Sequence, residues 1–242
     1  MRRVLAALVL SLASAWPVHA KPVRILFVGN ALLEDAEVPA RFASLARAMG
    51  KEAEVQSRIV RWASLEDHWR DEATHAAIAK GWDYVVLQQG PSAREEERAV
   101  LVVEAKRFTA EIAKTGAKTA LFMAWPQEPE RRRDIPAAIA AYRAAAEASG
   151  ALLIPAAEAW LRVLAQANPG RSRASPRAAA SDMAVLTSWF VLFPAGPQEF
   201  TEDYVERASR ELGIDPARRD AWFDAATRAI DEPMPLGARR IP

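Results

Sequence analysis

Apolar runs alternate with segments of helical periodicity along most of the chain. Continuous apolar runs are typical of strands that lie inside a sheet, and the predicted strands are 23–29, 52–60, 82–90, 117–126 and 151–156. Elsewhere apolar residues recur every three or four positions, and the predicted helices are 38–50, 64–81, 95–115, 135–150, 157–166 and 183–193. This alternation predicts an α/β fold of three layers, α/β/α, around a five-stranded parallel sheet.

The two ends of the chain differ from this middle part. Residues 1–20 have the pattern of a signal peptide, and the α/β domain is expected over 21–195. Residues 196–242 are predicted to form a C-terminal helical extension, with one helix at 200–212. A second helix is predicted to open at Asp215-Pro216, because Asp and Pro suit the N-cap and the first helical position.

The signal-peptide prediction rests on three features. Arg2 and Arg3 form a basic start, residues 4–16 are apolar, and Val18-His19-Ala20 fits the rule for cleavage after Ala20. The apolar run is short for a transmembrane helix, which disfavours the alternative of an N-terminal membrane anchor. We therefore expect a secreted or periplasmic protein with no membrane span after cleavage.

Composition excludes several kinds of chemistry. The chain has no cysteine, which excludes disulfides, thiol catalysis, cysteine zinc sites and lipid attachment through cysteine. The formal net charge of +1 gives no indication of a nucleic-acid partner. No motif for a cofactor is present, and none is predicted.

Five short segments occur in the order found in a known enzyme family. They are ILFVGNALLEDAEVP, ASLEDHW, WDYVVLQQGPS, LFMAWP and AYRAAAEASGALLIPAAEAW, within about residues 22–193. In this order they resemble the blocks of the SGNH (GDSL-type) hydrolases. The resemblance implies a flavodoxin-like SGNH hydrolase fold. It also implies ester hydrolysis by a serine nucleophile, with a histidine base that an aspartate orients.

The positions that should carry this chemistry hold other residues. The nucleophile position falls on Ala31, which has no hydroxyl. The glycine of the second block, whose N–H helps to hold the oxyanion, falls on Arg61 or Trp62. The asparagine of the third block has no clear match, although Gln89 or Ser92 could supply a donor.

The Asp-x-x-His-Pro motif of the family falls on residues 172–176, where Ser172 and Ser175 replace Asp and His. No histidine follows His75 anywhere in the chain. A triad of the family's geometry therefore cannot be assembled. The sequence predicts an inactive esterase, retained for binding.

One alternative is an active carbohydrate esterase or lipase with a rearranged site, in which Ser92 is the nucleophile and His68 the base. Ser92 follows a predicted strand, but a turn or capping serine is the simpler interpretation. A second alternative is a metal site. His68, Glu72 and His75 would share one face of a single helix over 64–81, although a solvated polar face explains the same spacing.

Binding residues are expected at the carboxyl ends of the strands, where parallel sheets hold their ligands. The candidates are Gly29, Asn30, Trp62, Gln89 and Trp125. Tryptophan at such a rim can stack on sugar rings. The predicted ligand is a glycan or an acyl-bearing molecule, and the alternative is a protein partner on the C-terminal helices at 200–230.

Overall fold

The sheet has five parallel strands in the order β2-β1-β3-β4-β5. In the computed structural model, which describes residues 21–166, 176–194 and 200–235, they are β1 (Val23–Gly29), β2 (Ala53–Ile59), β3 (Tyr84–Leu87), β4 (Lys118–Phe122) and β5 (Leu152–Ile154). All five predicted strands are therefore confirmed, and the fold class with them. β3 and β4 end earlier than predicted, because the residues that follow them form loops at the carboxyl edge.

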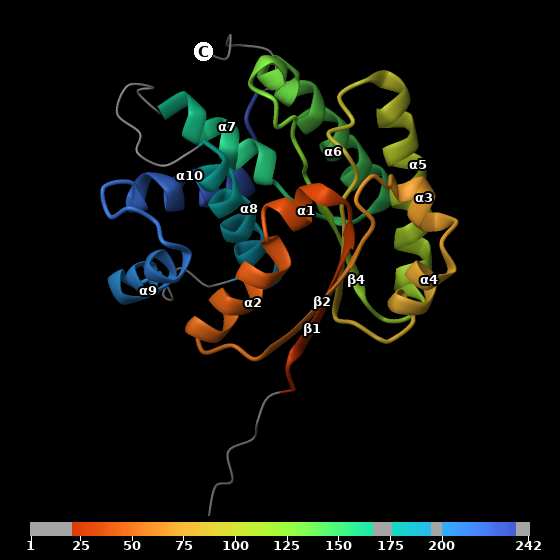
Figure 1. The fold of residues 1–242 in the computed structure, drawn as a ribbon, viewed down its shortest axis with the longest axis horizontal. Coiled ribbons are helices and arrows are strands. Elements are labelled where there is room, and N and C mark those ends of the chain that lie inside the picture. The colour runs from red at the N-terminus through yellow and green to blue at the C-terminus, as the bar shows by residue number, and fades with distance from the viewer. Residues whose placement is uncertain (1–20, 167–175, 195–199, 236–242) are drawn as a thin grey trace, which may run out of the picture.

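Helices cover both faces of this sheet and make the three predicted layers (Figure 1). α2 (Val38–Ala48) and α8 (Pro176–Leu192) lie on one face, and α7 (Ala156–Gln166) packs against α8. The other face is covered by α3 (Leu65–Trp69), α4 (Glu72–Ile78), α5 (Glu95–Ala113) and α6 (Ile135–Ser149). Two short elements, α1 (Ala31–Asp35) and the 3₁₀ helix η1 (Pro129–Asp134), follow β1 and β4.

The prediction of one helix over 64–81 is wrong, because two helices occupy this segment. Ser64 caps α3 in a capping box with Asp67, as its position suggested. Asp71 then accepts hydrogen bonds from the N–H groups of Ala73 and Thr74 and caps α4. The break at Asp71 is reinforced by an ion pair with Arg58 on β2, at 2.7 Å.

Aromatic side chains join the sheet to the helices on the α2 side. The rings of Phe27 on β1 and Phe42 on α2 are 5.9 Å apart, and Phe42 lies 5.8 Å from Trp189 on α8. All three side chains are almost fully buried. This contact fixes α2 and α8 together over β1, the central strand for the site described below.

The C-terminal segment forms the predicted helices α9 (Glu202–Leu212) and α10 (Arg219–Asp231). α9 packs against α2, and α10 packs against α7 and α8, so their apolar faces are buried. α10 begins later than the Asp215-Pro216 signal predicted, because Asp215 instead caps a turn through the N–H of Ala217. Within the described residues, no helix is both long and apolar enough to cross a bilayer.

A buried carboxylate connects this C-terminal part to the α/β domain. Glu158 on α7 is only 1% exposed and forms ion pairs with Arg143 on α6 and Arg162 on α7. It also accepts a hydrogen bond from the N–H of Met234, while Arg162 donates to the carbonyl of Arg228 on α10 at 3.2 Å. Two cations and one carboxylate therefore hold α10 and Met234 against α6 and α7.

We expect Glu158→Gln to lower the free energy of unfolding by about 2–3 kcal/mol, because it removes a buried carboxylate that pairs with two partly buried cations. Glu206→Gln is the matched control, since Glu206 forms only an exposed ion pair with Arg210 and should cost about 1 kcal/mol or less. Urea unfolding of both variants measures the difference. Equal losses in the two variants would contradict a structural role for the buried network.

Candidate functional site

An open hollow lies at the carboxyl edge of the sheet, beyond the ends of β1, β2 and β3. Its volume is about 410 Å³. It is formed by the turns after these three strands and by the first turns of α5. Four of its lining residues are candidates predicted from the sequence: Asn30, Trp62, Gln89 and Ser92. Because open parallel sheets bind their ligands at this edge, the hollow is the candidate functional site.

The nucleophile position of the resemblance lies beside this hollow, at the first residue of α1. Ala31 is 8% exposed, and its N–H donates to the carbonyl oxygen of Arg61 at 3.1 Å. The loop after β2 is therefore bonded to the backbone of residue 31. The methyl group of Ala31 has no proton to give, so this position offers no nucleophile.

The turn that precedes Ala31 has structural reasons of its own. A Cβ atom on Gly29 would lie 2.5 Å from Oε1 of Gln88 and 2.9 Å from Cδ1 of Leu33, so a larger residue would force these buried side chains to shift. Asn30 is the N-cap of α1 and accepts from the N–H of Leu32 at 3.1 Å. Its Nδ2 donates to the carbonyl of Ala63 at 3.0 Å. The amide of Asn30 is thus used in holding the fold.

Trp62 is the most exposed large apolar side chain in this region. It is 87% exposed and stands on the loop after β2, at the border of the hollow. The Arg61 guanidinium lies 5.9 Å from the centroid of the Trp62 ring and also pairs with Glu34 and Asp35 on α1. An indole held outward beside a hollow provides a flat surface for stacking.

The loop after β3 places Gln89 and Ser92 in the wall of the hollow, where both are buried. Nε2 of Gln89 donates to Oγ of Ser92 at 3.0 Å, and Oγ of Ser92 donates to the carbonyl of Gly90 at 3.0 Å. Oε1 of Gln89 accepts from the N–H of Leu65 at 3.2 Å. Ser92 also has a φ of 54°, which is uncommon for a residue other than glycine. Its hydroxyl proton points to a carbonyl and has no base as partner.

His68 lies on α3 behind this wall and is 1% exposed. Nε2 is 3.0 Å from the carbonyl oxygen of Gly29, which can only accept, so Nε2 carries the proton. Nδ1 is 3.0 Å from the hydroxyl oxygen of Thr74, and that hydroxyl donates its proton to the carboxylate of Asp71 at 2.7 Å. Burial lowers the pKa of His68, although the bond to Gly29 opposes the shift. Both ring nitrogens of His68 are therefore engaged, and neither of them with Ser92.

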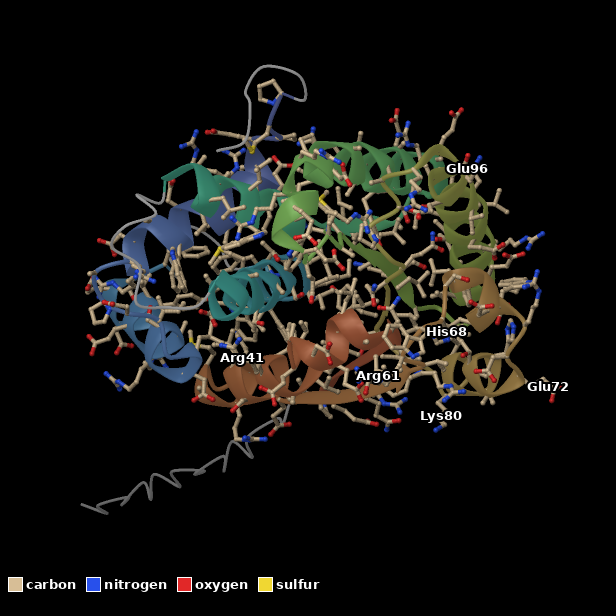
Figure 2. All side chains as sticks on the ribbon, turned by 45° about the horizontal axis from the view of Figure 1, so that its top comes forward. Arg41, Arg61, His68, Glu72, Lys80 and Glu96 are labelled. Carbon is tan, nitrogen blue, oxygen red and sulfur yellow. The ribbon has the colours of Figure 1, made fainter. Side chains whose placement is uncertain are left out.

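His75 and Glu72 do not join His68, because they lie on the separate helix α4. Nδ1 of His75 is 2.6 Å from Glu111 on α5, and Nε2 is 2.7 Å from the carbonyl of Trp69. These bonds raise the pKa of His75, with the Trp69 carbonyl as the largest cause. Glu72 is exposed at the outer surface, away from His68 (Figure 2). No group of three metal-binding side chains converges anywhere in the described ranges.

Another sequence candidate, Trp125, does not line the hollow. Trp125 is 7% exposed and packs beside Phe122, at 6.4 Å between ring centroids, so it belongs to the core below the edge. Ser172 and Ser175 lie outside the described residues. The rim therefore contains one of the two tryptophans that the sequence placed there.

Charged side chains around the hollow were not anticipated from the sequence. The lining includes Glu66, Glu96, Glu97 and Arg131. Glu66 pairs with Arg70, and Arg131 lies 3.3 Å from Asp134, whereas Glu96 forms no ion pair within the described ranges. The three consecutive glutamates at 95–97 were the available signal, since acidic residues favour the first turn of a helix. Their position at the hollow depends on how α5 packs.

Comparison with known proteins supports the fold. No protein-family model and no curated protein sequence matches the chain. One similar solved structure is a protein provisionally described as an SGNH hydrolase from Slackia heliotrinireducens, with 24% identity and a TM-score of 0.58 over 71% of this chain and 100% of that one. Another is a DUF4886 family protein from Bacteroides uniformis, with 16% identity and a TM-score of 0.60 over 90% of this chain and 98% of that one. The chain therefore has an SGNH hydrolase-like fold.

The two histidines of residues 21–242 should titrate on opposite sides of 6.5, the ordinary histidine pKa. We expect a midpoint below 6.5 for His68, because burial disfavours its charged form, and above 6.5 for His75, because its acceptors favour the charged form. NMR titration of the ring protons measures both, and His75→Gln assigns the signals.

These shifts give opposite contributions to stability. The contribution of His68 is complete above 6.5 and is lost as the pH falls toward its lowered pKa. The contribution of His75 is complete below 6.5 and is lost as the pH rises through its raised pKa. A His68 midpoint above 6.5 would contradict the buried, neutral ring.

Proposed function

We propose that this protein is an exported, catalytically inactive protein of the SGNH hydrolase fold, which binds a ligand in the hollow at the carboxyl edge. The main support is the residue at position 31, where the resemblance places the serine nucleophile and this chain has alanine. Ala31 supplies no nucleophile, and its N–H is bonded to the carbonyl of Arg61. The polar groups next to it, in Asn30 and Gln89, are also bonded within the protein.

The histidines give the second line of support. A serine hydroxyl needs a base within hydrogen-bond reach to become a nucleophile. His68 is bonded to Gly29 and Thr74, and His75 to Glu111 and the Trp69 carbonyl. No serine is hydrogen-bonded to either ring in the described part of the chain, so an acyl-transfer mechanism lacks its base there.

The proposed ligand is a glycan or an acyl-bearing saccharide. Trp62 provides an exposed indole face at the border of the hollow, where a sugar ring can stack. The carboxylates of Glu96 and Glu97 can accept hydrogen bonds from sugar hydroxyls. A protein partner on α9 and α10 is less favoured, because the apolar faces of both helices are buried against the domain.

The alternative is an active esterase with a rearranged site built on Ser92. One observation favours it: Ser92 lines the hollow with an unusual backbone, and such strain is common at catalytic residues. The hydrogen bond from its Oγ to Gly90 argues against it, since the proton is already committed to a carbonyl.

The proposal predicts no hydrolysis of a short-chain aryl ester above the buffer rate. The protein is expressed from the full-length sequence and purified after export, and we expect mass spectrometry to find Lys21 at its N-terminus. Ala31→Ser should also be inactive, because one restored hydroxyl still lacks a base. A clear rate that Ser92→Ala abolishes would establish the rearranged esterase, and turnover by Ala31→Ser alone would contradict the proposed loss of the base.

Ligand binding should depend on Trp62. We expect Trp62→Ala to weaken binding of an acylated oligosaccharide about tenfold, through loss of the stacking surface, and Trp62→Phe to retain part of it. Leu152→Ala is the control, since Leu152 is also an exposed apolar residue (39%) but lies on β5, away from the hollow. Isothermal titration calorimetry measures each affinity. Equal affinity in wild type and Trp62→Ala would contradict a contact between Trp62 and the ligand.

A further inference from the structure

β2 is an edge strand whose outer side has no partner among the described residues. It pairs with β1 alone, at one end of the sheet. Two hydrogen bonds show which backbone groups of this segment face β1. The carbonyl of Glu52 accepts from the N–H of Val23, and the N–H of Val60 donates to the carbonyl of Gly29. The groups that face β1 are those of the even-numbered residues, because successive residues in a strand present their backbone groups to opposite sides. Ala53, Val55, Ser57 and Ile59 therefore direct their N–H and C=O groups outward.

An open groove runs along this edge. It has a volume of about 550 Å³ and lies between residues 55–59 of β2 and the side of α2. The α2 wall consists of the small or compact residues Pro39, Ala40 and Ala43, so a neighbouring backbone can approach closely. Natural proteins usually protect such an edge, because an exposed strand pairs readily with another strand.

The side chains of β2 are self-complementary about Gln56. Glu54 and Arg58 lie two positions on either side of it, and all three share one face of the sheet. If two copies of β2 run antiparallel with Gln56 opposite Gln56, then each Glu54 lies opposite Arg58 of the second copy. Opposite charges in directly facing positions stabilise a strand pair. A register centred on Ser57 would instead place Glu54 opposite Val60.

The backbone fits the same register. With Gln56 on the twofold axis, Val55 faces Ser57 of the second copy, and Ala53 faces Ile59. These are the residues whose N–H and C=O groups point outward, so each facing pair can exchange two hydrogen bonds. The N–H and C=O groups of Gln56 point to β1. The two Gln56 residues on the axis therefore form a facing pair without hydrogen bonds between them.

The ion pairs within one copy extend this pattern. Glu54 is bonded to Arg24 on β1 at 2.7 Å, and Arg58 to Asp71 on α4 at 2.7 Å. A row of charged side chains would then cross the interface with alternating charge. It consists of Arg24 and Glu54 of one copy, followed by Arg58 and Asp71 of the second copy. No like charges are brought together along this row, and the twofold axis repeats it.

We propose that the occupant of this edge is a second copy of the chain, paired through antiparallel β2 strands in a continuous sheet across the dimer. A symmetric interface of this kind uses the same patch on both copies. α2 of each copy then lies on the same face of the joined sheet and covers the groove. The carboxyl ends of the two β2 strands point in opposite directions, which leaves each hollow open.

Analytical ultracentrifugation of the exported protein tests this proposal. We expect the wild type to sediment with twice the mass of one chain. Ser57→Pro should sediment with the mass of one chain, because proline removes an outward N–H that bonds no group in the sheet and blocks close approach. Ser57→Ala is the matched control and should remain a dimer. Far-UV circular dichroism confirms that each variant is folded.

A second variant tests the register without changing the backbone. Gln56→Lys places two like charges opposite each other on the axis, and we expect dimerisation to weaken by up to about fivefold. Gln56→Ala should dimerise nearly as the wild type does. A wild type that stays monomeric at every soluble concentration would overturn the proposal, and so would a dimer that persists in Ser57→Pro.

Discussion

The turn at the end of β1 is the constraint on which the whole carboxyl edge depends. The carbonyl of Gly29 accepts from the N–H of Val60 at 3.0 Å and lies 3.0 Å from Nε2 of His68. The N–H of Asn30 donates to Oε1 of Gln88 at 2.9 Å. One turn therefore fixes the loop after β2, the helix α3 and the end of β3 relative to one another. Glycine suits this position because a Cβ atom would displace the Gln88 side chain that holds the turn.

This arrangement gives the polar groups at the edge a structural role, although position 31 holds an alanine. The polar groups at the strand ends are used to hold the fold, since buried donors and acceptors without partners are costly. Asn30 and Gln89 bond within the protein, and His68 is a structural link rather than an accessible base. The Trp62 indole and the Glu96 carboxylate, by contrast, are exposed at the border of the hollow.

The molecule thus presents two open surfaces with different chemistry. The hollow at the carboxyl edge combines an aromatic face with carboxylates, and it opens along the direction of the strands. The groove beside β2 combines a free backbone edge with the small residues of α2, and it opens sideways. Because a strand pair across β2 leaves the strand ends uncovered, ligand binding and dimerisation can occur in the same molecule.

The sequence by itself determined the alternation of strands and helices along the chain, the parallel sheet and the missing hydroxyl at Ala31. These depend on local periodicity and residue identity. It also determined that no histidine follows His75. Only the tertiary structure decided that Asp71 breaks the predicted helix, that His68 is buried against β1 and that Trp62 alone of the rim tryptophans is exposed. The positions of His68 and Trp62 depend on contacts between residues far apart in the chain, such as the bond of His68 to Gly29, whereas the Asp71 break combines a local cap with the Arg58 ion pair. Periodicity reports burial along one element and carries no information about such partners.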